Sequence, residues 1–186
     1  MKINFRKEKG GYYLDVPVLC GDLKTSDFIT MKYDTAAFMT VVSKEVYYAN
    51  HFNMIKSKKL SVKGYGSYGV SGIAYKIPCV KLGARLLKGV WTFTPHDENI
   101  TDNILGCNVI EYYSPHQDNE DCVFYFYKNM KPAIYRDEYG ASLACDKIID
   151  LDTPEWQAAL LNKYPNSYAD LAHFDIMALS LLVQKE

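Results

Sequence analysis

Short apolar runs separated by Gly, Pro, Asn or Asp make up most of the chain from about residue 12 to residue 135. The runs are rich in Tyr, Val, Ile, Phe and Thr, which suit the half-buried surface of a sheet, and their spacing is typical of many short strands. We predict strands at YYLDVPVL, FITMKY, FMTVVS, GIAYKIPCVKL, LLKGVWTFTP and CVFYFYK. Short helices are predicted at KEVYYANHF and CNVIEYYS. The pattern favours a mainly β domain over residues 1–135.

Helical signals follow in residues 136–186. Residues 152–155 read DTPE, which offers N-cap candidates, a proline for the first turn and an acid near the positive end of the helix dipole. Pro165 ends this predicted helix. A second helix is predicted over residues 166–186, because apolar residues recur there at helical spacing. We expect this helical C-terminal extension to pack on the core of the β domain.

Composition and charge exclude several function classes. The chain has 186 residues, of which 48% are hydrophobic, so it can bury the core of one domain with an appendage. Its 21 Lys and Arg residues against 22 Asp and Glu residues give a formal net charge of -1, which provides no general attraction to nucleic acid or an anionic membrane. The basic run at residues 56–63 is predicted to be a solvated connection, because no aromatic residues are interleaved with it. We therefore expect no nucleic-acid partner.

The N-terminus has no continuous apolar region of the kind a secretory signal needs, and no stretch approaches the roughly 20 apolar residues of a membrane span. The cysteines are odd in number, are widely spread and form no C-x-x-C pair, which disfavours a disulfide framework or a structural zinc site. The histidines show no ligand spacing. We expect a cytoplasmic protein with reduced thiols, no membrane partner, no metal and no cofactor.

A lone carboxylate stands at the end of a predicted strand in KYDTAAFMTVVS. Taken alone, Asp34 is most simply a turn residue that caps backbone N–H groups. Two small residues, Ala36 and Ala37, follow it and would let the chain turn tightly and let another chain or a substrate approach. The hydroxyl of Thr35 could hold such a loop by hydrogen bonds. Two later motifs extend the pattern.

The first is the glycine-rich stretch KGYGSYGVSGIAYKI, and the second is NILGCNVIEYY, in which Ile104 and Leu105 precede Gly106. Together with Asp34 and the final strand CVFYFYK, they follow the order strand, Asp-Thr-small, strand, glycine-rich hairpin, two apolar residues with Gly, short helix and strand. This ordered set resembles the retropepsin-like (retroviral-type) aspartic protease family. The resemblance covers residues 12–127.

The resemblance implies a single-lobe, retropepsin-like closed β-barrel (the acid protease fold) with a C-terminal helical extension. It implies that Asp34 is catalytic and that Thr35 grips a twin chain, since one chain offers one such motif and the second carboxylate must come from a homodimer. The substrate would be a peptide or protein. The residues implied for the flap over the substrate are Gly64, Tyr65, Gly66, Ser67 and Tyr68. The residues implied for structural support are Ile104, Leu105 and Gly106.

One position departs from the family pattern: Ala36 stands where the family has Gly, beside the implied catalytic site. The leading hypothesis is an aspartic endopeptidase with a dyad of Asp34 from two identical chains. A second hypothesis is a catalytically silent retropepsin-like dimer that binds peptides or serves as an interaction module. A third is a small β-barrel unrelated to proteases.

Overall fold

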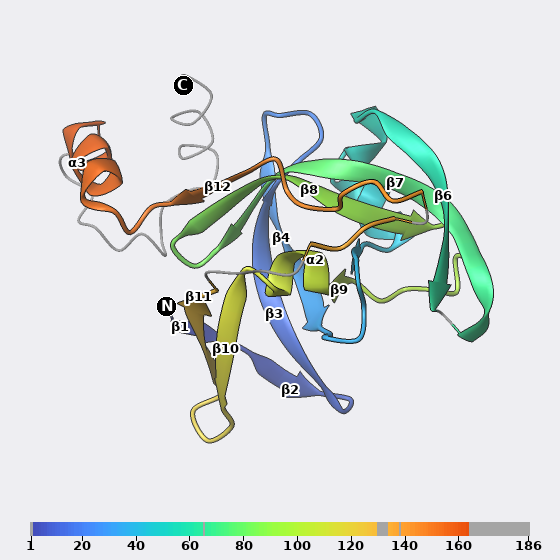
Figure 1. Ribbon diagram of the computed structural model, residues 1–186, viewed down its shortest axis with the longest axis horizontal. Coiled ribbons are helices and arrows are strands. Elements are labelled where there is room, and N and C mark those ends of the chain that lie inside the picture. The colour runs from blue at the N-terminus through green and yellow to red at the C-terminus, as the bar shows by residue number, and fades with distance from the viewer. Residues whose placement is uncertain (1, 65, 130–133, 138, 164–186) are drawn as a thin grey trace.

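The computed structural model describes residues 2–64, 66–129, 134–137 and 139–163 (Figure 1). The predicted second helix, residues 166–186, lies outside the described residues.

Six strands form a closed ring, each hydrogen-bonded to two neighbours. Around the ring the order is β3, β7, β8, β5, β9, β4 and back to β3. The pairs β4–β9 and β5–β8 are parallel and the others are antiparallel. The strands are β3 (Gly11–Leu19), β4 (Ser26–Tyr33), β5 (Thr40–Val41), β7 (Gly66–Leu82), β8 (Arg85–Pro95) and β9 (Ile104–Leu105). The prediction of a closed β-barrel is confirmed.

The remaining strands extend the barrel. β6 (Ser57–Gly64) pairs with β7 as a long hairpin, β2 (Arg6–Glu8) pairs with β3, and β12 (Lys147–Asp150) pairs with β8. A separate sheet consists of β1 (Lys2–Asn4), β11 (Val123–Lys128) and β10 (Tyr113–Asp118), in that order. Figure 1 shows this sheet below the barrel at the left, with the β6–β7 hairpin at the right. The helices are α1 (Lys44–Ala49), the 3-10 helix η1 (Phe52–Met54), α2 (Cys107–Ile110) and α3 (Pro154–Lys163).

Alternation along the strands builds the barrel core. In β3, Leu14, Val16 and Val18 are fully buried, while the intervening Asp15 is exposed. Such period-2 patterning is what a sheet with one buried face requires. Tyr75 of β7 is also fully buried, and its hydroxyl is satisfied by a hydrogen bond with the Thr94 hydroxyl at 3.1 Å. Burial of apolar side chains at about 25 cal/mol per Å² is the main force that closes the ring.

The basic run at residues 56–63 was predicted to be a solvated connection. This prediction is wrong, because the run forms most of strand β6. Leu60 and Val62 are buried, whereas Lys59 and Ser61, which precede them in turn, are exposed. Lys59 therefore occupies the outer face of an amphipathic strand, whereas Lys58 shares the face of Leu60 and Val62 and is half-buried. The charge of the run hid this period-2 pattern.

Residues 134–137 and 139–146, here termed the strap, return to the barrel before the C-terminal helix begins. The Leu143 N–H donates to the Tyr135 carbonyl at 2.8 Å, and Leu143 is 1% exposed. The next strand, β12, was not predicted, whereas helix α3 begins at Pro154 as predicted. The domain boundary between residues 135 and 136 stays a prediction.

Two ion pairs hold the strap against the sheet. Lys58 of β6 binds the carboxylate of Asp137 at 2.7 Å, and Lys76 of β7 binds Asp146. Both ammonium groups lie over the ring of Trp91, at 4.8 and 5.0 Å from its centroid. The Asp137 carboxylate is only 1% exposed and also accepts hydrogen bonds from the N–H groups of Tyr139 and Ala141. These contacts fix the strap to the hairpin.

Removal of the Lys58 ammonium should destabilise the fold. We expect Lys58→Ala to lower the free energy of unfolding by about 1–3 kcal/mol, because the nearly buried Asp137 carboxylate loses its cation. The hydrogen bond from Lys58 holds the pKa of Asp137 below its ordinary value of 3.8. The contribution is therefore fully present above pH 3.8 and is lost as the pH falls through the lowered pKa.

Urea unfolding of both proteins at neutral pH and at low pH measures this difference. The matched control is Lys59→Ala, which removes the exposed neighbouring lysine. Equal effects of the two substitutions at neutral pH would contradict the assigned role of the Lys58–Asp137 pair.

Candidate active site

The loop that carries Asp34 joins β4 to β5 and is closed by its own backbone. The Asp34 carboxylate accepts a hydrogen bond at 2.9 Å from the N–H of Ala36, and the Asp34 carbonyl accepts one at 3.4 Å from the N–H of Ala37. The N–H of Asp34 donates to the carbonyl of Leu105 at 3.3 Å. One carboxylate oxygen of Asp34 is thus held by the loop, which fixes the orientation of the acid.

Strand β9, which consists of Ile104 and Leu105, and helix α2, which follows Gly106, lie against this loop. The supporting role of these three residues stays a prediction. β9 pairs in parallel with the end of β4, in the register Lys32 to Ile104 and Tyr33 to Leu105. A side chain at Gly106 would overlap the carbonyl group of Met39 and the backbone nitrogen of Thr40. The absence of a Cβ therefore allows α2 to start directly against the loop.

The first residues of α2 bind the loop carbonyls. The N–H of Cys107 donates to the Ala37 carbonyl at 2.7 Å, and its thiol donates to the Thr35 carbonyl at 3.1 Å. The N–H of Asn108 donates to the Phe38 carbonyl at 3.2 Å. Burial raises the pKa of the Cys107 thiol, and the negative charges of Glu111 and Asp34 raise it further, so this sulfur keeps the proton that it donates.

Asn108 is a support residue that the sequence analysis did not identify. It is buried, and its side-chain oxygen accepts hydrogen bonds from the N–H of Thr40 at 2.7 Å and from its hydroxyl at 2.9 Å. Its side-chain nitrogen donates to the carbonyl of Trp91 at 2.7 Å. Asn108 therefore ties the end of the loop to β8. The sequence signal for it is an amide residue inside the otherwise apolar CNVI segment.

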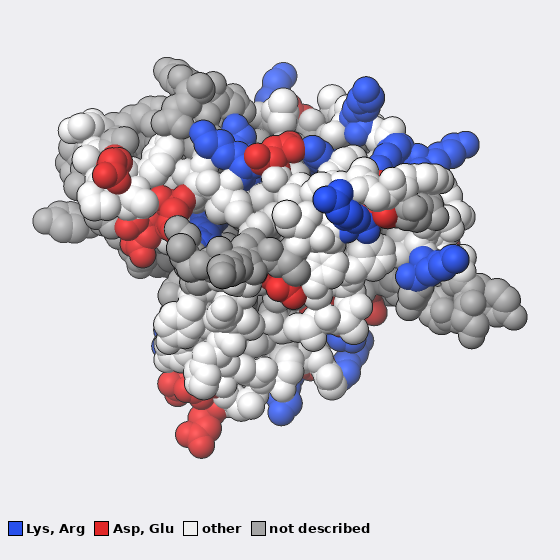
Figure 2. Space-filling model, viewed as in Figure 1, with Lys and Arg blue, Asp and Glu red and all other residues white. Residues whose placement is uncertain are grey.

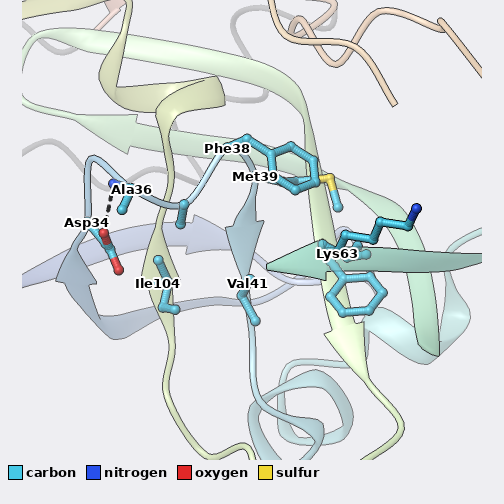
Figure 3. A pocket seen from close by; sticks show the side chains of 10 residues that line it. Asp34, Ala36, Phe38, Met39, Val41, Lys63 and Ile104 are labelled. Carbon is cyan, nitrogen blue, oxygen red and sulfur yellow. Dashed lines mark hydrogen bonds between the residues drawn. The ribbon is translucent and has the colours of Figure 1, made fainter. Parts of the chain in front are cut away.

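Asp34 lies at one end of a pocket of about 180 Å³ (Figure 3). Lys63 of β6 lies at the other end, with its ammonium directed away from Asp34. The side chains between them are mainly apolar. The lining residues are Asp34, Ala36, Ala37, Phe38, Met39, Val41, Val62, Lys63, Phe93 and Ile104. The pocket can therefore hold an apolar group beside a carboxylate.

The predicted loop residues lie at the surface around this pocket. Asp34 and Ala37 are half-buried, whereas Thr35 and Ala36 are exposed at the tip of the loop. The described non-glycine residues with positive φ are Lys9, Leu23, His51 and Cys122, so Ala36 is not in the left-handed region. The methyl group of Ala36 therefore causes no backbone strain, and the N–H of Ala36 remains available to Asp34.

The predicted flap residues belong to the tip of the β6–β7 hairpin. Gly64 pairs with Gly66, and Ser67 and Tyr68 continue β7. Tyr65 lies outside the described residues. The hairpin reaches the pocket through Val62 and Lys63, which the sequence analysis did not predict as site residues.

Within the part of the chain that the structure describes, no cluster of three or more His, Cys, Asp or Glu side chains could hold a metal ion. None of the described helices is both long enough and apolar enough to cross a bilayer.

Replacement of Asn108 tests its role as the tie between loop and barrel. We expect Asn108→Ala to lower the free energy of unfolding by about 1–3 kcal/mol for each buried group left without a partner, chiefly the N–H of Thr40 and the carbonyl of Trp91. Thermal and urea unfolding measure the loss. The control Asn53→Ala removes an exposed amide and should change stability by less than about 0.5 kcal/mol. A loss no larger than that of the control would refute the assignment.

No protein-family model and no curated protein matches this sequence. Among solved structures, the chain is similar to a crystal structure of a retropepsin-like aspartic protease from Rickettsia conorii, with 17% sequence identity and a TM-score of 0.48. The alignment covers 68% of this chain and 89% of that one. In this chain itself, the closed barrel, the Asp34 loop, the β6–β7 hairpin and the β9–α2 support stand in the predicted order. The structure thus shows a closed β-barrel with these elements arranged around it.

Proposed function

We propose that this protein is an aspartic endopeptidase that hydrolyses peptide bonds with Asp34 from two identical chains. The observation that carries the proposal is the position of the Asp34 carboxylate, which lies at one end of a mainly apolar pocket and is oriented by the N–H of Ala36. A carboxylate held in this way can act on a group bound in the pocket.

The mechanism requires a second carboxylate, which a second copy of the chain would supply. A two-fold axis beside the loop would bring the two Asp34 side chains together. The exposure of Thr35 and Ala36 at the loop tip supports this arrangement, because a second loop can approach there. The Thr35 hydroxyl would then grip the partner loop.

Two carboxylates in close contact share one proton, because like charges at short distance disfavour ionisation of both. The ionised Asp34 takes a proton from a water molecule as the water oxygen attacks the peptide carbonyl carbon. The protonated Asp34 of the other chain gives its proton to the carbonyl oxygen. Collapse of the tetrahedral intermediate then breaks the C–N bond as a proton passes to the leaving nitrogen.

The β6–β7 hairpin would act as the flap in this proposal. Substrate would bind beneath it as an extended strand, and closure would exclude water from the dyad. Gly64, Gly66, Ser67 and Tyr68 would form the moving tip. The cysteines form no disulfide, which supports a reducing compartment and hence a cytoplasmic location.

The alternative function is a catalytically silent dimer that binds peptides. It is favoured by one observation: the methyl group of the exposed Ala36 lines the same pocket as Asp34 and occupies space beside the carboxylate. Two substitutions separate these functions.

Replacement of Asp34 tests catalysis directly. We expect the wild type to cleave members of a diverse peptide mixture between acid and neutral pH, and Asp34→Asn to lose at least about 10³-fold in rate, because an amide cannot take up the water proton. Mass spectrometry of the products measures cleavage. The rate per chain should rise with protein concentration if a dimer is required. Equal cleavage by both proteins would exclude Asp34 as the catalytic acid.

Replacement of Ala36 tests the silent alternative. We expect Ala36→Gly to retain cleavage and to lower the free energy of unfolding by about 0.4–1 kcal/mol, because glycine increases the entropy of the unfolded chain. The same peptide mixture and urea unfolding measure both effects. An inactive wild type with an active Ala36→Gly variant would instead show that the methyl group silences the site.

A further inference from the structure

A second pocket adjoins the one at Asp34. It has a volume of about 210 Å³ and shares Phe38, Val62 and Lys63 with the first pocket. The two pockets therefore meet along the β6 edge. The residues that line the second pocket are Phe38, Leu60, Ser61, Val62, Lys63, Arg136 and Asp137.

The strap supplies one wall of this second pocket, through Arg136 and Asp137. The N–H groups of the Arg136 guanidinium are held on one side by the carbonyl of Gly140 at 2.7 Å, while the side chain stays exposed. The bond between Asp137 and Lys58 fixes the adjoining backbone to β6. Arg136 is thus held at the pocket by a segment that lies beyond the part of the chain resembling retropepsins.

The exposed charged side chains that line the second pocket are both cationic. Among the residues that the structure describes, neither Lys63 nor Arg136 forms an ion pair. The acid that lines the pocket, Asp137, is 1% exposed and neutralised by Lys58. Figure 2 shows Lys and Arg side chains gathered over the part of the molecule where β6, β7 and β8 lie, and acidic side chains at the far tip of the β10–β11 hairpin.

We infer that this second pocket is a subsite for an acidic side chain of the peptide. In an extended peptide, side chains two residues apart point to the same side and lie about 7 Å from one another. An apolar side chain in the pocket at Asp34 would therefore place the side chain two positions away in the second pocket. There the carboxylate of Glu or Asp meets the cations of Lys63 and Arg136. The inference rests on the proposed peptide cleft at Asp34.

The test separates binding from cleavage. Fluorescently labelled peptides carry a central Leu and, two positions to either side of it, Glu, Gln or Lys. Fluorescence anisotropy measures their dissociation constants for Asp34→Asn, which should bind peptides without cutting them. We expect the Glu peptide of one series to bind about three- to tenfold tighter than its Gln counterpart, and the Lys peptide to bind weakest. The preference should shrink as salt is added, because the cations are exposed.

Variants in the Asp34→Asn background assign the effect to the two cations. The double substitution Lys63→Gln with Arg136→Gln should abolish the preference for Glu, and Lys63→Glu with Arg136→Glu should turn it into a preference for Lys. Both residues are exposed, so the variants should fold, as circular dichroism verifies. The control Lys56→Gln removes an exposed lysine that lines neither pocket and should leave the preference unchanged.

The outcomes distinguish this inference from the proposed function. Equal binding of the Glu, Gln and Lys peptides, or no binding of any peptide, would overturn the subsite. So would a preference that survives loss of both cations. Cleavage by the wild type without any preference for Glu would support the endopeptidase and reject the subsite. A preference for Glu with no cleavage would support the subsite in a silent peptide-binding protein.

Discussion

The contact between Gly106 and the backbone of Met39 is the constraint on which the candidate site depends. Because Gly106 has no Cβ, helix α2 begins against the Asp34 loop, and its first N–H groups donate hydrogen bonds to the carbonyls of Ala37 and Phe38. The loop in turn holds the Asp34 carboxylate at the end of the pocket. The orientation of one acid is therefore set by a segment distant in sequence. A loop without that support would have to order its own backbone at the expense of conformational entropy.

The sequence predicted the barrel because its strands depend on local patterns. Strands such as GYYLDVPVL alternate buried and exposed residues, and Gly after two apolar residues marks a close approach. The pocket depends instead on contacts between segments far apart. Phe93 belongs to β8, Val62 and Lys63 to β6, and no local pattern relates them to Asp34. Strand β12 was missed because four residues, KIID, gain their strand conformation only by pairing with β8.

Charge accounts for two further differences between sequence and structure. The lysines of residues 56–63 obscured strand β6, although Leu60 and Val62 are buried between them. One of these lysines, Lys58, neutralises Asp137 and so fixes the strap, while Lys63 reaches the rim of the pocket. The lysines of one basic run thus occupy different environments: Lys58 forms an ion pair, Lys59 faces solvent and Lys63 lines the pocket. Only the three-dimensional partners of each lysine separate these roles.

The closed ring also orders the events of synthesis. Strand β5 pairs with β8 and β9, and β4 pairs in parallel with β9. These early strands therefore cannot complete their pairing until later parts of the chain have been synthesised. Before Gly106 and Asn108 have left the ribosome, the Asp34 loop lacks both the backbone contact at Gly106 and the hydrogen bond that links Asn108 to β8. The wall of the second pocket comes later still, with Arg136. During synthesis, Asp34 is therefore present before its pocket, and the candidate site forms only when most of the protein has been made.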